Sequence, residues 1–544
     1  MGHEVELVEK YEYEPTFYEW QFGGGIEDVD LYNPGGLHPV DIGDVIDGRF
    51  EVFRKLGAGG FGVVWLCIHK PSNKWRALKI HAAIHSTANT NKELEILQFL
   101  QSQSSPEELE KNNIAVPIEH FYIQGPNGRH LCFVLPVFGS SSSTWSLQQN
   151  HQLESTLVAI KSVCRQLAKG IRFLHRNGIV HGDIKPKNIL MKLKGIDDLN
   201  KDQMSELLGE LETMPVETTS GVDPGPHAPK YFVKPVDEYW CKKLATPDIA
   251  IIDFGESFHA EKSKGDWGIP IAYAAPEVVF PEAAAGSDGF SSDVWSLACT
   301  MFEIRTADPL FAGGSSPEAL VRIFELYLGP LPDMYLAAWN AESPEERERN
   351  STTEGVDLKN DDTFSDGLLP VTWEAAELLE ERGHIREGTS CTDVLEAELM
   401  QERCRNLSVS RGHDRDETIR YRYSREDTLA LADLLHGILK YNPNDRLTME
   451  HICRHSWLDD RAKYQIIYDN PNFGILGTLR SGLVLAFIIG VLAVSAVVFQ
   501  HFVNGAPSSR VSSISPGVCP LKDSQELAGQ VFLTQCASPT PGLL

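Results

Sequence analysis

The chain carries little positive charge for its length. Its 544 residues include 49 lysines and arginines but 76 aspartates and glutamates, which gives a net charge of −27. Such a charge repels phosphate backbones, so the composition argues against nucleic acid as a direct partner. The ten cysteines include no C-x-x-C pair and no cluster with histidine at metal-ligand spacing. We therefore expect reduced thiols, with neither a disulfide framework nor a zinc site.

The amino-terminal 20 residues lack a basic stretch followed by an apolar one. They are acidic and aromatic, and are therefore not a secretory signal. The whole chain has 42% hydrophobic and 23% charged residues, which is the usual composition of a globular protein. Collagen-like, coiled-coil and wholly disordered chains are excluded by this composition, and a sizeable core is expected.

Apolar spacing divides the chain into two kinds of structure. Short β-branched and aromatic runs, separated by Gly, Pro and Asn, follow residue 45 and are typical of strands joined by turns. Residues 153–176 place apolar side chains at intervals of three and four, and the same spacing returns over 293–305, 317–328 and 427–439, which predicts helices. A β-rich part followed by a helix-rich part predicts an α+β fold in two lobes.

Three segments lack this spacing. Residues 1–45 mix acidic and aromatic residues with turn-forming Gly, Asn and Pro, and we expect an extended arm. Residues 193–247 are polar and then proline-rich, and residues 341–425 are rich in acids and arginines. Both are expected to be insertions in loops, the second a solvated and partly helical surface segment.

A glycine-rich pattern lies between two of the strand-like runs. Gly57, Gly59 and Gly62 form G-x-G-x-x-G. A dinucleotide-binding fingerprint needs a helix at the third glycine, whereas a second strand follows here. Glycines in such a hairpin let backbone N–H groups approach phosphates, because no Cβ intervenes. The pattern alone also occurs in plain turns, so the hypothesis of a phosphate lid depends on the rest of the chain.

Four further motifs follow the glycine-rich hairpin in a fixed order. Lys79 ends an apolar strand, and H-G-D-I-K-P-K-N over residues 181–188 follows the amphipathic helix. The motif D-F-G begins at Asp253, and A-P-E ends at Glu277. Each motif has an ordinary structural explanation when taken singly, but the chance assembly of all five in this order is negligible.

Together these motifs resemble those of eukaryotic-type protein kinases, and we expect a kinase domain over residues 46–458. The resemblance implies a two-lobed protein-kinase fold that binds ATP and Mg²⁺. It implies that Lys79 pairs with a helix glutamate, for which Glu93 is preferred to Glu95 because Leu97 follows it at the family's spacing. The implied nucleotide-binding residues are Leu56, Gly57, Gly59, Gly62, Val64, Lys79 and Glu93.

The resemblance also assigns the catalytic and metal-binding roles. Asp183 would accept the proton of the substrate hydroxyl, Lys185 would neutralise the γ-phosphate as in serine/threonine kinases, and Lys79 would hold the α- and β-phosphates. Asn188 and Asp253 would bind the two magnesium ions. Three more residues resemble scaffold positions of the family, namely Asp293, Glu277 and Arg446.

Finer features are similar to the SR-protein kinases, which phosphorylate serines in arginine/serine-rich proteins such as splicing factors. They are the arm, the H-G-D-I-K-P-K-N loop, the insertion before D-F-G, and the L-G-P-L-P stretch at residues 328–332. The resemblance implies arginine/serine-rich protein substrates, and the surplus of acids suits them because carboxylates pair strongly with guanidinium groups.

Three departures keep other functions open. Gly182 stands where the SR-protein kinases usually have threonine, Ala274 stands where related kinases have arginine, and the insertion at 193–247 is shorter than the family's long spacer. One alternative is an active serine/threonine kinase of other specificity. A second is a pseudokinase-type binding scaffold, although the chain retains the whole set of nucleotide and catalytic residues.

A long hydrophobic run follows the kinase-like region. Residues 482–499 contain 12 Leu, Ile, Val or Phe and no charge, and as a helix they would span about 27 Å, close to the bilayer core. We predict a transmembrane helix over 482–503 and a carboxy-terminal tail over 504–544. The alternatives are a buried or partner-binding helix and a faulty gene model.

Basic residues are more frequent before the hydrophobic run than after it. Arg461, Lys463 and Arg480 precede it, whereas Arg510 and Lys522 follow it. The positive-inside rule then places the kinase-like region on the cytoplasmic side of a membrane. We therefore expect a cytoplasmic kinase domain, with the nucleus as a second compartment and a single carboxy-terminal span as the anchor.

Overall fold

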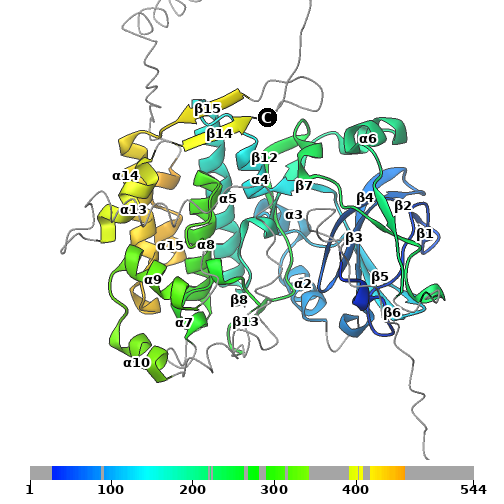
Figure 1. Cartoon of the computed structure of the whole chain (residues 1–544), viewed down its shortest axis with the longest axis horizontal. Helices are drawn as coiled ribbons and strands as arrows, with labels where there is room; N and C mark the ends of the chain where they lie inside the picture. Colours follow the sequence, from blue (N-terminus) through cyan, green and yellow to red (C-terminus); the bar gives the residue numbers. More distant parts are fainter. Residues whose placement is uncertain are drawn as a thin grey trace, which may run out of the picture. The chain divides into compact units, whose positions relative to one another are not determined.

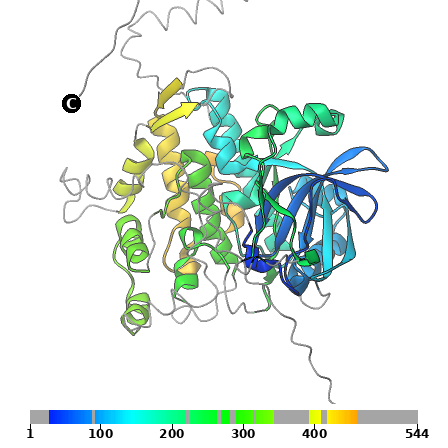
Figure 2. The same ribbon diagram turned by 45° about the vertical axis from the view of Figure 1, so that its right-hand side comes forward.

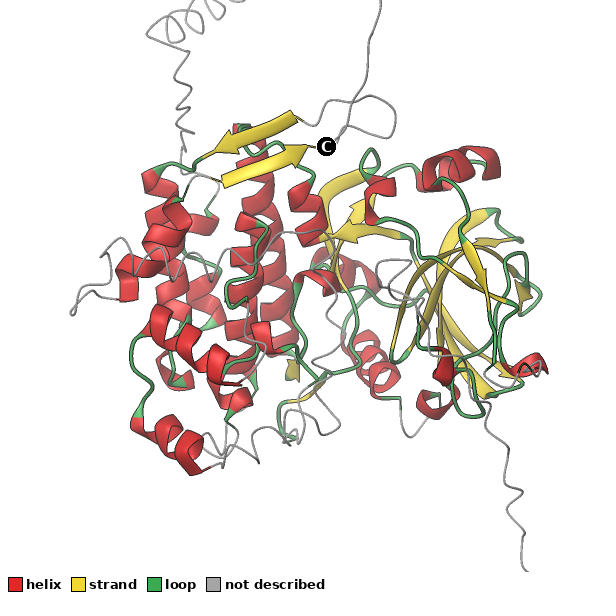
Figure 3. Ribbon diagram, viewed as in Figure 1, coloured by secondary structure: helices red, strands yellow, loops and turns green. Residues whose placement is uncertain are grey.

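The computed structural model describes residues 27–86, 91–218, 221, 225–262, 268–280, 289–312, 317–341, 391–401, 403–407 and 417–459. All of them belong to one compact unit of the chain, Met1–Tyr468. They form a β-rich small lobe and a helical large lobe, as Figures 1 and 3 show. The predicted α+β, two-lobed protein-kinase fold is confirmed.

The small lobe is built on a six-stranded antiparallel sheet in the order β1-β2-β3-β4-β6-β5. Its strands are β1 (Val45–Ile46), β2 (Phe50–Gly59), β3 (Gly62–His69), β4 (Lys74–His81), β5 (Glu119–Gly125) and β6 (Gly128–Leu135). Its helices and 3-10 turns are η1 (Val29–Leu31), η2 (Ala83–His85), α2 (Lys92–Gln103) and α3 (Pro106–Lys111). Asn91 begins α2 because its side-chain oxygen accepts the backbone N–H of Leu94 at 2.7 Å.

The large lobe surrounds helices α5 and α8. Nearly every residue of α8 after its first turn is buried, so this helix lies at the centre of the lobe. The helices are α4 (Ser142–Leu147), α5 (Glu154–Arg176), α7 (Pro276–Val279), α8 (Phe290–Thr306), α9 (Pro317–Leu328), α10 (Asp333–Ala341), α13 (Cys391–Met400), α14 (Arg425–Ile438) and α15 (Met449–Ile452). The 3-10 turns are η3 (Pro186–Asn188), η7 (Ile271–Tyr273), η9 (Pro443–Asp445) and η10 (Ser456–Leu458).

Short strands line the large lobe where it meets the small one. A three-stranded sheet runs in the order β12-β9-β7, and β13 pairs with β8. These strands are β7 (Phe138–Ser141), β8 (Ile179–Val180), β9 (Ile189–Leu193), β12 (Ala245–Ile251) and β13 (Phe258–His259). The H-G-D-I-K-P-K-N motif (residues 181–188), here called the catalytic loop, lies between β8 and β9, and D-F-G follows β12. Pairing of β9 with β12 therefore brings the two motifs together.

The arm before the sheet packs on the small lobe and is not simply extended. Its apolar side chains at Val29, Tyr32, Leu37 and Val40 are buried in the same cluster as residues of β2, β3 and β4. Glu27 forms a fully buried ion pair with Lys55 at 2.6 Å, and the hydroxyl of Tyr32 donates to the same carboxylate. The Gly, Asn and Pro content predicted turns correctly, but the packing depends on partners that are distant in the sequence.

The first insertion is folded rather than a plain loop. It contains η4 (Ile196–Asp198), α6 (Lys201–Leu208), β10 (Thr213–Pro215), η5 (Gly225–His227), β11 (Tyr231–Val233) and η6 (Glu238–Cys241). Helix α6 packs beside the sheet (Figure 2), where Met204 is buried in a cluster with Leu66, Ile68 and Trp75. The predicted insertion over 193–247 thus has helices and strands of its own, because apolar residues scattered among polar ones find partners on the small lobe.

The second insertion is described only in part. Helix α13 lies within it, and strands β14 (Arg403–Leu407) and β15 (Glu417–Tyr421) form an antiparallel hairpin. Within the described residues, no helix is both long and apolar enough to cross a bilayer. The predicted span over 482–503 and the tail over 504–544 lie outside the described residues.

Candidate active site

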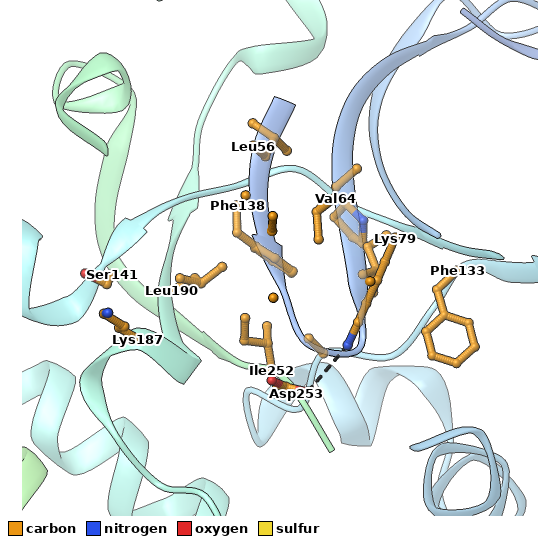
Figure 4. Close-up of a pocket in the computed structure, with 18 of the residues that line it drawn as sticks. Leu56, Val64, Lys79, Phe133, Phe138, Ser141, Lys187, Leu190, Ile252 and Asp253 are labelled. Carbon is orange, nitrogen blue, oxygen red and sulfur yellow. Dashed lines mark hydrogen bonds and ion pairs between the residues drawn. The ribbon is translucent and has the colours of Figure 1, made fainter. Parts of the chain in front are cut away.

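A cavity of about 400 Å³ lies where the two lobes meet. The residues labelled in Figure 4 come from both lobes. They belong to the glycine-rich hairpin, to β4 and β6, to β7, to η3 and β9, and to the two residues that follow β12. The sequence-predicted nucleotide residues Leu56, Gly57, Gly59, Gly62, Val64, Lys79 and Glu93 all line it, as does Asp253. Most of the wall is apolar. Lys79, Glu93 and Asp253 form an ionic group at one end, whereas Lys187 lies beside Ser141 away from that end (Figure 4). An apolar wall with an ionic end suits a ligand with a flat base and a charged group.

The three glycines of the hairpin differ in why glycine occupies the position. A Cβ at Gly57 or Gly59 would meet no atom within 4 Å, so the backbone there is open to a ligand. A Cβ at Gly62 would lie 2.3 Å from the carbonyl oxygen of Ile80, because β4 passes close to it. Gly62 is therefore needed for strand packing, whereas the backbone at Gly57 and Gly59 is left open on the cavity side.

Lys79 lies between two carboxylates at the ionic end of the cavity. Its Nζ is 2.8 Å from Glu93 Oε2 and 3.4 Å from Asp253 Oδ1, so the structure contains the expected pair with Glu93 rather than Glu95. Burial disfavours charge on Lys79, but the carboxylates of Asp253 and Glu93 outweigh it and raise its pKa. The pKa of Asp253 is lowered because Lys79 overcomes the opposing effect of burial. Both groups therefore stay charged at neutral pH.

Asp183 is buried and held on one side. Its Oδ2 is 3.0 Å from the ammonium of Lys185 and accepts the amide N–H of Asn188 at 2.8 Å. Its Oδ1 is buried without a hydrogen-bond partner in the described structure. A buried carboxylate oxygen without a partner is costly, and a catalytic role is one explanation for such an atom. Burial raises the pKa of Asp183, although Lys185 opposes the shift.

Asp293 on α8 supports the loop that carries Asp183. Its carboxylate accepts the backbone N–H groups of His181 at 2.8 Å and Gly182 at 2.9 Å, and the ring of His175 at 2.9 Å. Gly182 has a φ of +78°, a left-handed conformation that glycine adopts without strain. The departure from threonine at this position is therefore compatible with the local backbone.

The D-F-G segment packs against the same loop. Asp253 has a φ of +63°, which turns the chain sharply after β12, and Phe254 is buried with its ring 5.2 Å from that of His181. Ser257 donates its hydroxyl to the carbonyl of His181 at 2.8 Å. These contacts place the carboxylate of Asp253 beside Lys79 and the cavity.

Several wall residues had not been predicted. Ala77 could have been found, since it lies two residues before Lys79 and side chains two apart share a face of a strand. Val236, Glu238 and Trp240 also line the cavity, and all three belong to the first insertion. No local pattern marks them, because their position depends on how the insertion returns to β12.

One cleft contains a glycine-rich hairpin, a lysine paired with a glutamate, and a buried aspartate. This fold and this site define an ATP-dependent phosphotransferase. The family profile described as protein kinase domain matches residues 50–200 and 241–458. The chain belongs to the protein kinase family, whose members use ATP and a divalent metal.

Three named relatives have similar sequences. SRSF protein kinase 3 from Homo sapiens is 40% identical over 167 residues, which cover 30% of this chain and 29% of that protein. Serine/threonine-protein kinase SRPK from Physarum polycephalum is 30% identical over 293 residues, 52% of this chain and 67% of that protein. Serine/threonine-protein kinase SKY1 from Saccharomyces cerevisiae is 32% identical over 179 residues, 32% and 24% of the two chains. Within the protein kinase family, this chain is similar to the SR-protein kinases. Its match spans less than a third of the length of the human relative.

Proposed function

We propose that this protein transfers the γ-phosphoryl group of ATP to serine side chains of arginine/serine-rich proteins. The observation that carries the chemistry is the unpaired Oδ1 of Asp183 in the cleft. The support for the substrate class is the similarity to relatives named as SRSF and SRPK kinases, together with the excess of acidic residues.

In this mechanism Asp183 aligns the serine hydroxyl and accepts its proton at Oδ1. Lys185 and Asn188 occupy Oδ2, so the carboxylate presents a single oxygen to the nucleophile. The ionised carboxylate is the active form, and burial moves its protonation to a higher pH than is usual for aspartate. Lys79 supplies positive charge where phosphate oxygens carry negative charge, and Glu93 holds it there.

Asn188 and Asp253 are suited to hold Mg²⁺. Asp253 is kept ionised by Lys79. Asn188 uses its amide nitrogen for Asp183, which leaves its amide oxygen for a cation. Carboxylate and carbonyl oxygens are the ligands Mg²⁺ takes in phosphoryl-transfer sites, where it shields phosphate charge when bound. Among the residues the structure describes, no group of three or more His, Cys, Asp or Glu side chains forms a separate metal site.

An arginine/serine-repeat peptide is expected to be the best of three matched substrates. The other two are a proline-directed serine peptide and an acidic serine peptide, each incubated with labelled ATP and Mg²⁺. Guanidinium–carboxylate hydrogen bonds are worth about 1.5–3 kcal/mol, so we expect a preference of about tenfold or more in kcat/KM. Faster turnover of the proline-directed peptide would reject the substrate class, and no transfer to any peptide would favour the scaffold alternative.

The run over 482–503 is proposed as a single membrane anchor, with the kinase domain in the cytoplasm or nucleus. In cells, we expect the full chain in the membrane fraction, from which detergent but not carbonate extracts it. Truncation after residue 475 should release an active kinase from the membrane. A charge at the centre of a span costs about 2.5–3.5 kcal/mol, so Ile489→Arg together with Val491→Arg should have the same effect as truncation. Full-length protein that fractionates away from membranes without detergent would contradict the anchor.

A further inference from the structure

The segment that ends the first insertion, here called the return segment (residues 236–241), is attached to both sides of the nucleotide cleft. At one end the backbone N–H of Val236 donates to the carbonyl of Lys55 on β2 at 3.0 Å. At the other end the thiol sulfur of Cys241, which is fully buried, accepts the N–H of Ser140 on β7 at 3.1 Å. The return segment therefore bridges the glycine-rich strand and the strand that leads into the large lobe.

Within this segment, Glu238 is fixed on a residue of the cleft wall. Its Oε2 accepts the backbone N–H of Ser141 at 2.9 Å and the hydroxyl of Ser141 at 2.8 Å. Asp237 begins the 3-10 turn by accepting the N–H of Tyr239 at 2.8 Å. Two hydrogen bonds to one oxygen set the direction of the Glu238 carboxylate.

The other oxygen of this carboxylate remains available. Oε1 of Glu238 has no hydrogen-bond or ion-pair partner among the described residues, and Glu238 is exposed while lining the cavity. An ionised carboxylate is an acceptor only, so its complement is a hydroxyl or N–H donor and not a phosphate. The ligand group that fits must therefore carry donors and no negative charge.

The position of Ser141 shows which part of a nucleotide would meet this carboxylate. In Figure 4, Ser141 lies at the end of the cavity away from Lys79. Because Lys79 and Asp253 define the phosphate end, the opposite end is where a sugar or base is placed. A ribose offers two adjacent hydroxyl donors, which match a carboxylate with one unoccupied oxygen.

We propose that Glu238, held by Ser141, accepts hydrogen bonds from the ribose hydroxyls of the bound nucleotide, so that the insertion forms part of the nucleotide site. Residues 201–240 lie outside the match to the protein kinase family, so the assignment concerns this chain's own insertion. The inference rests on the proposed ATP-dependent function. Glu238 is then a specificity residue for the sugar, acting in addition to the phosphate contacts.

The test compares nucleotides that differ in the sugar. Dissociation constants of ADP, 2′-deoxy-ADP and 3′-deoxy-ADP are measured by calorimetry on the wild-type full chain, Glu238→Ala, Glu238→Gln and the control Glu206→Ala, which removes an exposed glutamate of α6. Because hydrogen bonds to a charged group are strong, we expect Glu238→Ala to raise the dissociation constant of ADP about tenfold or more. The same variant should leave the dissociation constant of at least one deoxy-ADP nearly unchanged. Glu206→Ala should change the dissociation constant of none of the three nucleotides.

The outcomes separate this inference from the proposed function. Wild-type protein that binds none of the nucleotides would remove the basis of both. Wild-type protein that binds all three, with Glu238→Ala weakening them equally or not at all, would overturn the ribose assignment alone. Glu238→Gln keeps an acceptor for Ser141 and guards against a local folding defect. Unchanged thermal unfolding with lost sugar discrimination in this variant would support the assignment, and retained discrimination would contradict it.

Discussion

Asp183→Asn is expected to lower kcat by about 10²–10⁴-fold, the usual contribution of a general base. Asparagine has nearly the same shape but cannot accept the proton of the serine hydroxyl. It also keeps an oxygen for Lys185, which lies 3.0 Å from the carboxylate in the native protein. The measurement is single-turnover transfer from labelled ATP to the preferred peptide, together with ADP binding and thermal unfolding.

The matched control is Asp198→Asn, which makes the same chemical change at an exposed position in η4. It should retain the wild-type rate. Asp183→Asn should still bind ADP and unfold near the wild-type temperature, because the lost function is proton transfer. A nearly normal rate in Asp183→Asn would show that another group takes the proton, and the role given to Oδ1 would be wrong.

Arg446→Met is expected to destabilise the large lobe by about 3–5 kcal/mol, the cost of removing one partner from a buried ion pair. The two terminal nitrogens of the guanidinium, Nη1 and Nη2, each lie 2.6 Å from a carboxylate oxygen of Glu277. The two side chains are 1% and 2% exposed. Without Arg446, the charge of Glu277 is left buried with one donor, the hydroxyl of Ser292 at 2.8 Å. The measurement is the urea midpoint of the transition that reports the large lobe.

An exposed pair provides the comparison for Arg446. Lys234 and Glu212 form an ion pair at 3.1 Å, with side chains 36% and 51% exposed. Lys234→Met should cost at most about 1 kcal/mol, because water screens such pairs. Adding Glu277→Gln to Arg446→Met should restore part of the lost stability, since the unpaired charge disappears. Equal urea midpoints for Arg446→Met and the wild type would refute the structural role of the pair.

The sequence was most informative where chemistry determines residue type and spacing. Lys79, Glu93 and Asp253 were identified from separate motifs, and the structure brings them within hydrogen-bonding distance. Phosphate charge demands a cation, a metal ligand and a mobile glycine backbone, and few residue types meet those demands. The roles of these residues remain predictions.

The sequence was least informative where position depends on distant partners. Glu238 is polar, exposed and preceded by a proline-rich stretch, which is ordinary for a loop. Its place in the cleft depends on Ser141, 97 residues earlier in the chain. Gly62 was expected to approach phosphate because it completes the motif, yet the crowding that requires glycine there comes from β4. Local patterns predict elements, but they do not carry such tertiary constraints.

The packing of the arm against the first insertion affects the order in which the small lobe is completed during synthesis. The N–H of Ile42 donates to the hydroxyl of Tyr231, 189 residues later, and Phe232 shares a buried cluster with Val29. A ribosome adding about 5–20 residues per second needs roughly 10–40 s to cover that distance. Residues 181–188 are therefore synthesised before the partner of the arm, and the core of the small lobe is completed only after residues 231–232 have been added.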